Sequence, residues 1–214
     1  MTLEPHEPRK LRADAERNRE LLVEAARTVF SQQGLDAPLD EIAKHAQVGN
    51  ATMYRRFATR DDLIFAAFAP IVQANIIAVK EALKQEDSWK GFCQYTRYAF
   101  ELQSQDRGIS ELLGSRLTRS IEPFEPLRTK IYTAMSKLIA RAVDDGHLRA
   151  DFQIEDLLVL MTANAAVISH TSTDSPNAWK RFVQLAFDGL RAEPPVSTPL
   201  FDDEKQHSES PSPD

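Results

Sequence analysis

The segment from residue 50 to residue 60 gathers side chains that can hydrogen-bond to nucleic-acid bases and phosphates. Asn50 has an amide of the kind that bridges N6 and N7 of adenine, and Arg55 has a guanidinium that matches O6 and N7 of guanine. The hydroxyl groups of Thr52 and Tyr54 can bond to phosphate oxygens. These residue types at the start of one short helix favour contact with double-stranded DNA.

Charge is distributed unevenly along the chain. The 26 Lys and Arg residues against 32 Asp and Glu residues give a net charge of −6, which argues against a partner held by bulk positive charge. Residues 193–214 hold six acidic residues and one lysine, a net of −5, so only −1 remains for residues 1–192. From Ile42 to Arg60 there are four basic residues and no acidic residue, a net of +4. The local distribution therefore favours nucleic acid where the total does not.

Helical periodicity predicts the elements that must position these side chains. An apolar stripe from Leu22 to Phe30 predicts a first helix that stops at Gly34. A second, short helix is expected to open at Pro38, and a third to run from Asn50 to about residue 57, with Asn50 as its capping residue. The order long, short, short, with a tight turn over residues 47–49, is typical of a helix-turn-helix unit.

An alternative interpretation of the same segment is structural. Tyr54 and Phe57 would then pack the unit, and the arginines would form a solvated face. For Phe57 we favour this packing role. Gly49, in contrast, is expected to leave room for the backbone to approach a duplex.

The rest of the chain is also predicted to be helical, so the expected fold class is all-α. Few glycines and the 3.6-residue period speak against a turn-dense sheet. A long helix is expected to start at Thr59 in a capping box with Asp62 and to be kinked at Pro70. Further helices are expected at 88–104, 108–117, 124–145, 154–170 and 177–191.

Composition and periodicity suggest four regions. Residues 1–15 are expected to be a flexible N-terminal arm, and residues 193–214 a disordered acidic tail, since both hold little that could be buried. Residues 16–62 are expected to form the three-helix DNA-binding domain. Residues 63–192 are expected to form a helical domain for ligand binding and dimerisation.

The run AARTVFSQQGLDAPLDEIAKHAQVGNATMYRRFATRDDLIFAAF resembles the N-terminal domain of the TetR family of transcriptional regulators. The matching elements are AAR-x-x-F, the stop at Gly34, DEIA, VGNATMYRRF and TRDDL, over about residues 16–68. The resemblance implies a bacterial one-component sensor. Such a protein is a homodimer with an N-terminal helix-turn-helix and a variable helical ligand domain.

On the matching positions, the resemblance implies that Asn50 and Tyr54 approach base edges and that several neighbours contact phosphates or adjacent bases. The DNA-binding set is Lys44, Gly49, Asn50, Ala51, Thr52, Tyr54, Arg55, Arg56 and Arg60. Basic residues of the arm, Arg9, Lys10 and Arg12, either add backbone or minor-groove contacts or are solvated charges. Family members often have His or Tyr at the position of Arg56, and often Ser or Thr near residues 38–39. That hydroxyl is missing here, so no DNA contact is assigned there.

The second half of the chain is expected to hold a small-molecule effector. The stretches SQDRGISELLGSRL and DDGHLRADF resemble a subgroup of these regulators, but neither identifies a ligand. The middle helices mix aromatic, flexible and polar side chains, and the candidate ligand residues are Phe92, Tyr95, Phe100, Met135, Met161 and Asn164. For each of these residues alone, ordinary core packing is an open alternative.

The last two predicted helices are the candidate dimer interface. Helix 154–170 is apolar on nearly all sides, and helix 177–191 has a strong apolar stripe. The interface residues are expected to be Leu157, Leu158, Met161, Ala165, Ile168, Trp179, Phe182, Val183, Ala186, Phe187 and Leu190. A four-helix bundle from two subunits would suit a palindromic operator, whose half-sites lie ~34–36 Å apart. Absorption of both faces by one monomer core is the alternative.

Several other classes of function receive little support from the sequence. A single cysteine, Cys93, the absence of a signal-peptide pattern, and a longest nearly apolar stretch of only residues 157–168 favour a cytoplasmic protein without a membrane span. The histidines lack metal-ligand spacing, and no nucleophile motif or phosphate loop is present, so we expect no metal, no cofactor and no enzymatic activity.

The predicted function is a ligand-responsive DNA-binding regulator. It is expected to be a repressor that releases a palindromic operator when a small molecule binds the C-terminal domain. An activator or a ligand-independent regulator of the same fold is the closest alternative. A helical protein-interaction module or an enzyme is a more distant one.

Overall fold

The computed structural model describes residues 7–114 and 121–192, and in these ranges it is built from helices without any strand. The α-helices are α1 (Glu7–Gln33), α2 (Leu39–His45), α3 (Asn50–Arg56), α4 (Arg60–Ala82), α5 (Ser88–Gln105), α6 (Arg107–Gly114), α7 (Glu125–Asp144), α8 (Ile154–Thr171) and α9 (Ala178–Leu190); a 3-10 turn, η2 (Glu122–Phe124), precedes α7. The all-α prediction is confirmed.

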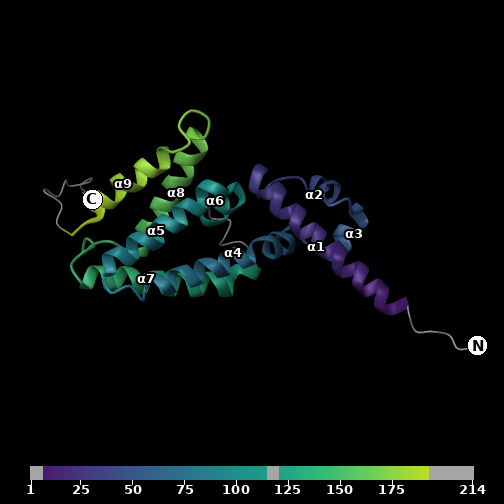
Figure 1. Cartoon of the computed structure of the whole chain (residues 1–214), viewed down its shortest axis with the longest axis horizontal. Coiled ribbons are helices and arrows are strands. Elements are labelled where there is room, and N and C mark those ends of the chain that lie inside the picture. Colours follow the sequence, from purple (N-terminus) through teal and green to yellow (C-terminus); the bar gives the residue numbers. More distant parts are fainter. Residues whose placement is uncertain (1–6, 115–120, 193–214) are drawn as a thin grey trace, which may run out of the picture.

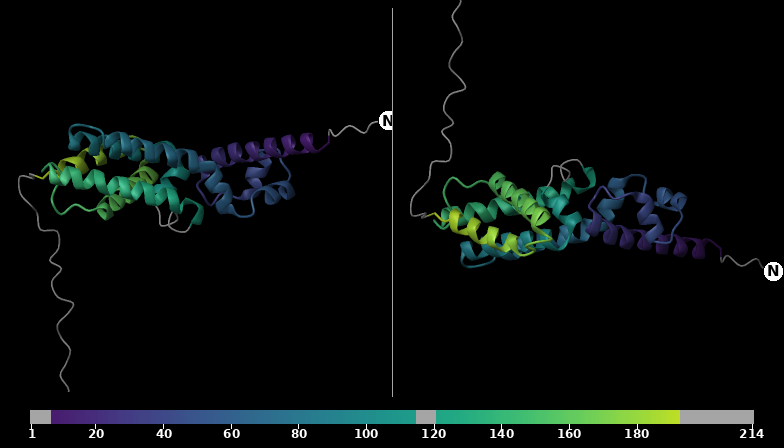
Figure 2. Two further views of the ribbon diagram at one scale, coloured as in Figure 1. Left: turned by 90° about the horizontal axis from the view of Figure 1, so that it is seen from below. Right: turned by 90° about the horizontal axis from the view of Figure 1, so that it is seen from above.

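The molecule is elongated, with α1, α2 and α3 at one end and α5 to α9 at the other (Figure 1). We call residues 7–59 the head and residues 83–192 the body. Helix α4 leaves the head and runs along the body, where it contacts α5 and α7 (Figure 2). The positions of α2 and α3 therefore depend on how α1 and α4 are held.

Helix α1 starts earlier than the sequence pattern predicts. It begins at Glu7, so residues 7–15 are helical and the expected flexible arm over 1–15 is wrong for them. Ala, Arg, Glu, Lys and Leu dominate these residues and are strong helix formers, so the amphipathic helix continues toward the N-terminus. Its far end extends beyond the rest of the head (Figure 1). Residues 1–6 and the acidic tail 193–214 lie outside the described residues.

The C-terminal end of α1 is defined by Gly34. This residue has φ 91°, the left-handed conformation that glycine adopts without a Cβ clash, and its N–H donates to Phe30 O at 2.9 Å. The predicted stripe of α1 is buried, with Leu22 and Phe30 fully so. The predicted stop is therefore confirmed.

The start of α4 is the predicted capping box. The Asp62 N–H donates to Thr59 Oγ1 at 3.1 Å, and the Thr59 N–H donates to Asp62 Oδ2 at 3.0 Å. Helix α4 then continues through Pro70 to Ala82 as one element. It is the longest apolar helix of the described residues, with a mean hydropathy of 1.8 over 18 residues, so the placement of the longest apolar stretch at 157–168 is wrong. Half of that segment is buried against protein, because α4 packs on α1, α5 and α7.

Two hydrophobic cores divide the described residues. The head core surrounds α1 and extends into α4 as far as Val72, and it includes Ile109 and Leu112 of α6. The body core begins at Val79 and joins α5, α7, α8 and α9. The head core thus crosses the domain boundary expected at residues 62–63, because α6 packs directly on α1.

Polar contacts fix α6 to the end of α1 and to the loop that follows it. Glu111 Oε2 accepts from the Leu35 N–H at 2.7 Å, and Arg27 of α1 forms an ion pair with the buried Asp106. A side chain at Gly108 would collide with Phe68, so the glycine permits close approach. Helix α6 therefore links the head to the body. The predicted helix 108–117 is described only as far as residue 114.

Candidate nucleic-acid interface

Helices α2 and α3 are joined by a compact turn over residues 46–49. The Val48 N–H donates to Ala43 O at 3.0 Å, and Gln47 is in the left-handed region with φ 56°. Gly49 has ordinary dihedrals, φ −65° and ψ 143°, and a Cβ there would meet nothing within 4 Å. Gln47, not Gly49, therefore makes the left-handed step, and no contact within the described residues requires a glycine at position 49.

Helix α3 buries one edge and exposes the other. Met53 and Phe57 are buried, one turn apart, and the guanidinium of Arg19 lies over the Phe57 ring at 5.6 Å. The packing role predicted for Phe57 is thus confirmed. Tyr54 is 53 % exposed, so it does not pack the unit.

The predicted DNA-binding residues of α2 and α3 share one property, accessibility. Those that are exposed are Lys44, Gly49, Asn50, Ala51, Tyr54, Arg55 and Arg56, and Thr52 is half-buried. None of the ion pairs formed by the described residues involves Lys44, Arg55 or Arg56. Their positive charges are thus available to phosphates.

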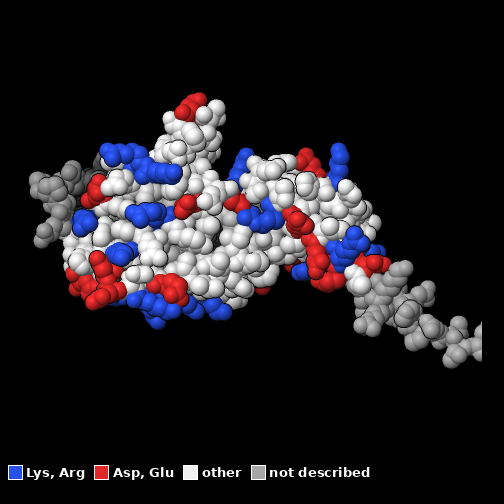
Figure 3. Space-filling model, in the orientation of Figure 1, with Lys and Arg blue, Asp and Glu red and all other residues white. Residues whose placement is uncertain are grey.

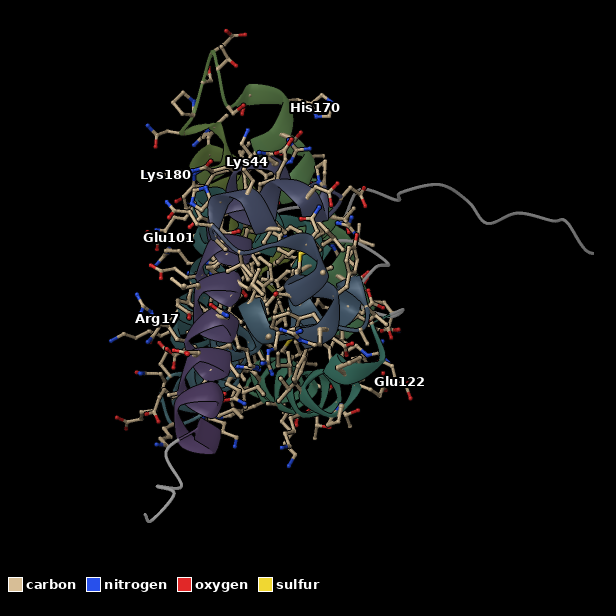
Figure 4. All side chains as sticks on the ribbon, turned by 90° about the vertical axis from the view of Figure 1, so that its right-hand side faces the viewer. Arg17, Lys44, Glu101, Glu122, His170 and Lys180 are labelled. Atoms are coloured by element: carbon tan, nitrogen blue, oxygen red, sulfur yellow. The ribbon has the colours of Figure 1, made fainter. Side chains whose placement is uncertain are left out.

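Seen from the head end, Lys44 of α2 and Arg17 of α1 lie on the side of the molecule that faces the viewer (Figure 4). Over the broad face of the molecule, acidic and basic residues are interspersed (Figure 3). The surface in that view therefore has no large region of one sign that would attract nucleic acid in place of α3.

Asn50 occupies a different position from the one expected. Gly49 precedes α3 in an extended conformation, so Asn50 is the first helical residue and its side chain caps no backbone group. Its Nδ2 instead donates to Asp40 Oδ1 of α2 at 3.1 Å. The predicted cap is wrong, because the chain reaches helical geometry at residue 50, one residue earlier than a cap at Asn50 would require. Asp40 also brings an exposed carboxylate beside the basic segment.

Arg60 differs from the other arginines of the predicted set. Its Nη1 donates to Leu35 O at 2.9 Å and to Ala37 O at 2.7 Å, and the residue is half-buried. It thereby secures the loop between α1 and α2. A DNA contact by Arg60 stays a prediction, as do contacts by Arg9, Lys10 and Arg12, whose side chains are outside the described residues.

A cavity of about 1130 Å³ lies in the body, between α4, α5, α6, α7 and α8. Of the predicted ligand residues, Tyr95, Met135 and Met161 line it. Charged side chains occur only among its more exposed lining residues: Glu125 and Arg128, which pair with each other, and Glu155. The cavity is therefore apolar inside and charged at its opening.

The other three predicted ligand residues belong to the core and do not line the cavity. Phe92 and Phe100 are buried against aromatic neighbours. The Nδ2 of Asn164 donates to Gln103 Oε1 at 2.9 Å, which joins α8 to α5. Phe92 and Phe100 face α9, where they contact Phe187 and Phe182. A ligand contact by these three residues stays a prediction. Sequence reasoning missed Asn75, a buried polar residue inside the apolar α4, which lines the cavity.

The predicted dimer residues fall into two groups. Buried in the core of a single chain are Leu157, Met161, Trp179, Val183 and Phe187; half-buried are Leu158, Ala165, Ile168, Phe182, Ala186 and Leu190. The first group packs within one chain, where α9 contacts α5 and α8. A role of either group in a dimer stays a prediction. Two exposed apolar residues of the same helices were not predicted, Val159 of α8 and Leu185 of α9, and Val159 also lines the cavity.

The fold and the exposed α3 define a helix-turn-helix protein with a helical C-terminal body, and comparisons with known proteins agree. Residues 22–67 match the family model for bacterial regulatory proteins of the tetR family. Residues 87–192 match the model for the C-terminal domain of SbtR-like transcriptional regulators. No curated protein sequence matches the chain.

Solved structures extend the match over both parts of the chain. The TetR regulator SCO0520 from Streptomyces coelicolor is 30 % identical, with 81 % of this chain and 98 % of that chain covered and a TM-score of 0.52. A TetR regulatory protein from Mycobacterium vanbaalenii is 27 % identical, with 85 % and 99 % covered and a TM-score of 0.50. FadR from Bacillus subtilis, in complex with stearoyl-CoA, shares the fold at 13 % identity, with 80 % and 99 % covered and a TM-score of 0.60.

The chain belongs to the TetR family of transcriptional regulators. It is accordingly a DNA-binding transcriptional regulator.

Proposed function

We propose that the protein is a repressor that acts as a homodimer in the cytoplasm and releases a palindromic operator when a small molecule occupies the cavity of the body. The observation that carries the DNA-binding part is the accessible face of α3. Tyr54, Arg55 and Arg56 are exposed there, and the arginines have no acidic partner among the described residues. Such side chains on a recognition helix combine base reading with phosphate contacts.

The effector part of the proposal is supported by the elements that connect the cavity to the head. Helix α4 is capped beside the head at Thr59 and lines the cavity at Val72. Helix α6 bonds to the head through Glu111 and lines the cavity at Leu112. A ligand that separates α4 from α6 would change the position of the head. FadR from Bacillus subtilis, which has the same fold, binds stearoyl-CoA.

For a ligand to release DNA, the free energy of ligand binding and the free energy of DNA binding must be coupled. The ligand must prefer the conformation that fits DNA poorly, and DNA must then weaken ligand binding by the same factor. This reciprocity separates an effector from a molecule that merely fills space.

Dimerisation would place one α3 in each half-site of the operator. Two large exposed apolar residues of α8 and α9, Val159 and Leu185, are 66 % and 55 % exposed and would be covered in the dimer. Analytical ultracentrifugation at micromolar concentration is expected to show a dimer. A stable monomer would contradict this part of the proposal.

A mobility-shift titration with the DNA upstream of the protein's own gene tests the function. The wild-type protein should bind that DNA more tightly than a shuffled sequence of equal composition. Tyr54→Ala should reduce the preference with little loss of stability, because more than half of the Tyr54 surface is exposed. Equal affinity for both sequences would contradict a sequence-specific regulator, and transcription in vitro would separate repression from activation.

A further inference from the structure

The buried end of the body cavity contains two polar side chains with unused hydrogen-bonding capacity. Asn75 of α4 and Tyr95 of α5 both line the cavity, and each is 2 % exposed. Asn75 Oδ1 and the Tyr95 hydroxyl are buried, and neither has a hydrogen-bond partner. Buried polar groups are almost always bonded, and one left unbonded costs stability, so a pair of them inside a cavity requires an explanation.

The Asn75 side chain lies close enough to the Tyr95 hydroxyl to act on it as a hydrogen-bonding neighbour, but no hydrogen bond of normal geometry joins the two. Burial raises the pKa of Tyr95, and the neighbouring Asn75 side chain opposes that rise. The phenol is therefore neutral at physiological pH and can both donate and accept a hydrogen bond. The amide of Asn75 likewise offers donor and acceptor capacity. A ligand group that bonds to both Asn75 and Tyr95 must be uncharged and must be able to donate and to accept a hydrogen bond.

The surroundings of the pair exclude a charged group at this end. Its buried neighbours in the cavity wall are apolar, for example Leu112, Phe124 and Met161. The charged lining residues lie toward the more exposed part of the wall, where Glu125 and Arg128 pair with each other. A carboxylate or phosphate placed beside Tyr95 would lose its hydration without gaining a counter-ion. An uncharged hydroxyl group would lose much less hydration free energy than a carboxylate or phosphate, and it could replace its bonds to water by bonds to Asn75 and Tyr95.

We propose that the cavity binds an uncharged, largely apolar molecule that carries a hydroxyl group, and that this hydroxyl bonds to both Asn75 and Tyr95. The cavity volume of about 1130 Å³ accommodates a molecule of more than one ring, since drug-sized sites measure roughly 300–1,000 Å³. As effector chemistry, the inference rests on the proposed function. As ligand binding, it is measured without DNA.

Three naphthalenes of similar shape test the head group: 2-naphthol, 2-methylnaphthalene and 2-naphthoate. Their dissociation constants for the full-length protein at pH 7 are measured by equilibrium dialysis. We expect 2-naphthol to bind about ten-fold more tightly than the methyl compound, as two hydrogen bonds to otherwise unsatisfied groups allow, and more tightly than 2-naphthoate. Equal or tighter binding of either competitor would overturn the proposal, as would failure of all three to bind.

Variants of Tyr95 and Asn75 test whether these two side chains cause the preference for 2-naphthol. Tyr95→Phe removes only the hydroxyl and Asn75→Leu removes the amide, and each should reduce the advantage of 2-naphthol over 2-methylnaphthalene several-fold. Two controls on α5 leave the cavity wall unchanged: Tyr98→Phe removes a half-buried hydroxyl, and Thr96→Val removes a buried hydroxyl that also has no partner. The controls should retain the full preference. Persistence of the preference in both Tyr95→Phe and Asn75→Leu would contradict the assignment.

Thermal unfolding of each variant shows whether the fold is retained, and Tyr95→Phe is the decisive variant if Asn75→Leu disturbs packing. Operator release is measured separately by mobility shift. If 2-naphthol is preferred but does not weaken DNA binding, the ligand class stands and the effector role fails. If 2-naphthoate binds best and releases DNA, the effector role stands and the ligand class is wrong.

Discussion

The α2–α3 unit and the body cavity are assembled from the chain in opposite ways. The DNA-facing side chains come from adjacent turns of one short segment, Leu39–Arg56, whose exposed face follows from helical period and turn length. The cavity wall comes from α4, α5, α6, η2, α7 and α8, which are far apart in sequence. A convex site on one helix can be predicted locally, whereas a concave site depends on which faces of several helices remain uncovered.

The largest expected effect tests the cavity side of this comparison. Phe92 is fully buried and packs against Phe152, with ring centroids 5.8 Å apart, so it belongs to the body core. Phe92→Ala should lower the free energy of unfolding by about 3–5 kcal/mol, because it leaves a void in a packed core. Urea unfolding measures this loss. The exposed Leu185→Ala is the control and should change stability by no more than about 0.5 kcal/mol. A loss of that small size for Phe92→Ala would restore Phe92 to the cavity wall.

The next effect tests the α3 side. Arg55 is exposed, so Arg55→Ala should leave the fold intact and weaken operator binding by about 1–3 kcal/mol if it reads a base. Titrations at several salt concentrations separate the two possible roles, since loss of a phosphate contact lowers the salt dependence and affects all sequences alike. Arg181→Ala on α9 is the matched control for an exposed arginine far from α3. Equal operator binding by wild type and Arg55→Ala would remove Arg55 from the interface.

A smaller effect concerns the joint between the two regions. Thr59→Ala removes the side chain that accepts from the Asp62 N–H and should lower the free energy of unfolding by about 1 kcal/mol. Thr59→Ser keeps the accepting oxygen and should retain most of that stability. Thermal unfolding compares the two. Similar losses in both variants would show that packing of the methyl group matters, not the cap.

The smallest effect sharpens the charge balance of the DNA-facing surface. Asp40 accepts from Asn50 and places a carboxylate beside an otherwise basic segment. Asp40→Asn should therefore strengthen DNA binding a few-fold for all sequences, since even in bulk water two unit charges about 4 Å apart interact by about 1 kcal/mol. Asp174→Asn, at an exposed site in the body, is the control. Weaker binding by Asp40→Asn would instead assign Asp40 a role in orienting Asn50.

Much of the fold could be predicted because its signals are local. The capping box at Thr59, the stop at Gly34 and the apolar stripe from Leu22 to Phe30 each depend on residues within a few turns of one another. Helix starts with weaker signals were predicted less well. The composition of residues 1–15 predicts disorder, although residues 7–15 continue α1. Asn50 is predicted to cap α3, although it is the first residue of that helix.

The candidate sites show the same division. Exposure of Tyr54 and burial of Phe57 follow from their positions on α3. The roles of Phe92 and Phe100 do not follow from residue type, since an aromatic side chain in a middle helix suits a core and a cavity equally well. Which of the two it joins is decided by α9, which covers that side of α5.

The sequence by itself determined the helical class, the position of the recognition helix and the local excess of positive charge, because these depend on period, capping and neighbouring residues. Tertiary structure alone decided that Arg60 secures a loop, that α6 bonds the head through Glu111, and that Asn75 meets Tyr95 at a buried end of the cavity. The physical reason is that hydrogen bonding and burial depend on contacts between helices. Residues 20 positions apart along the chain, such as Asn75 and Tyr95, become neighbours only when α4 and α5 pack together.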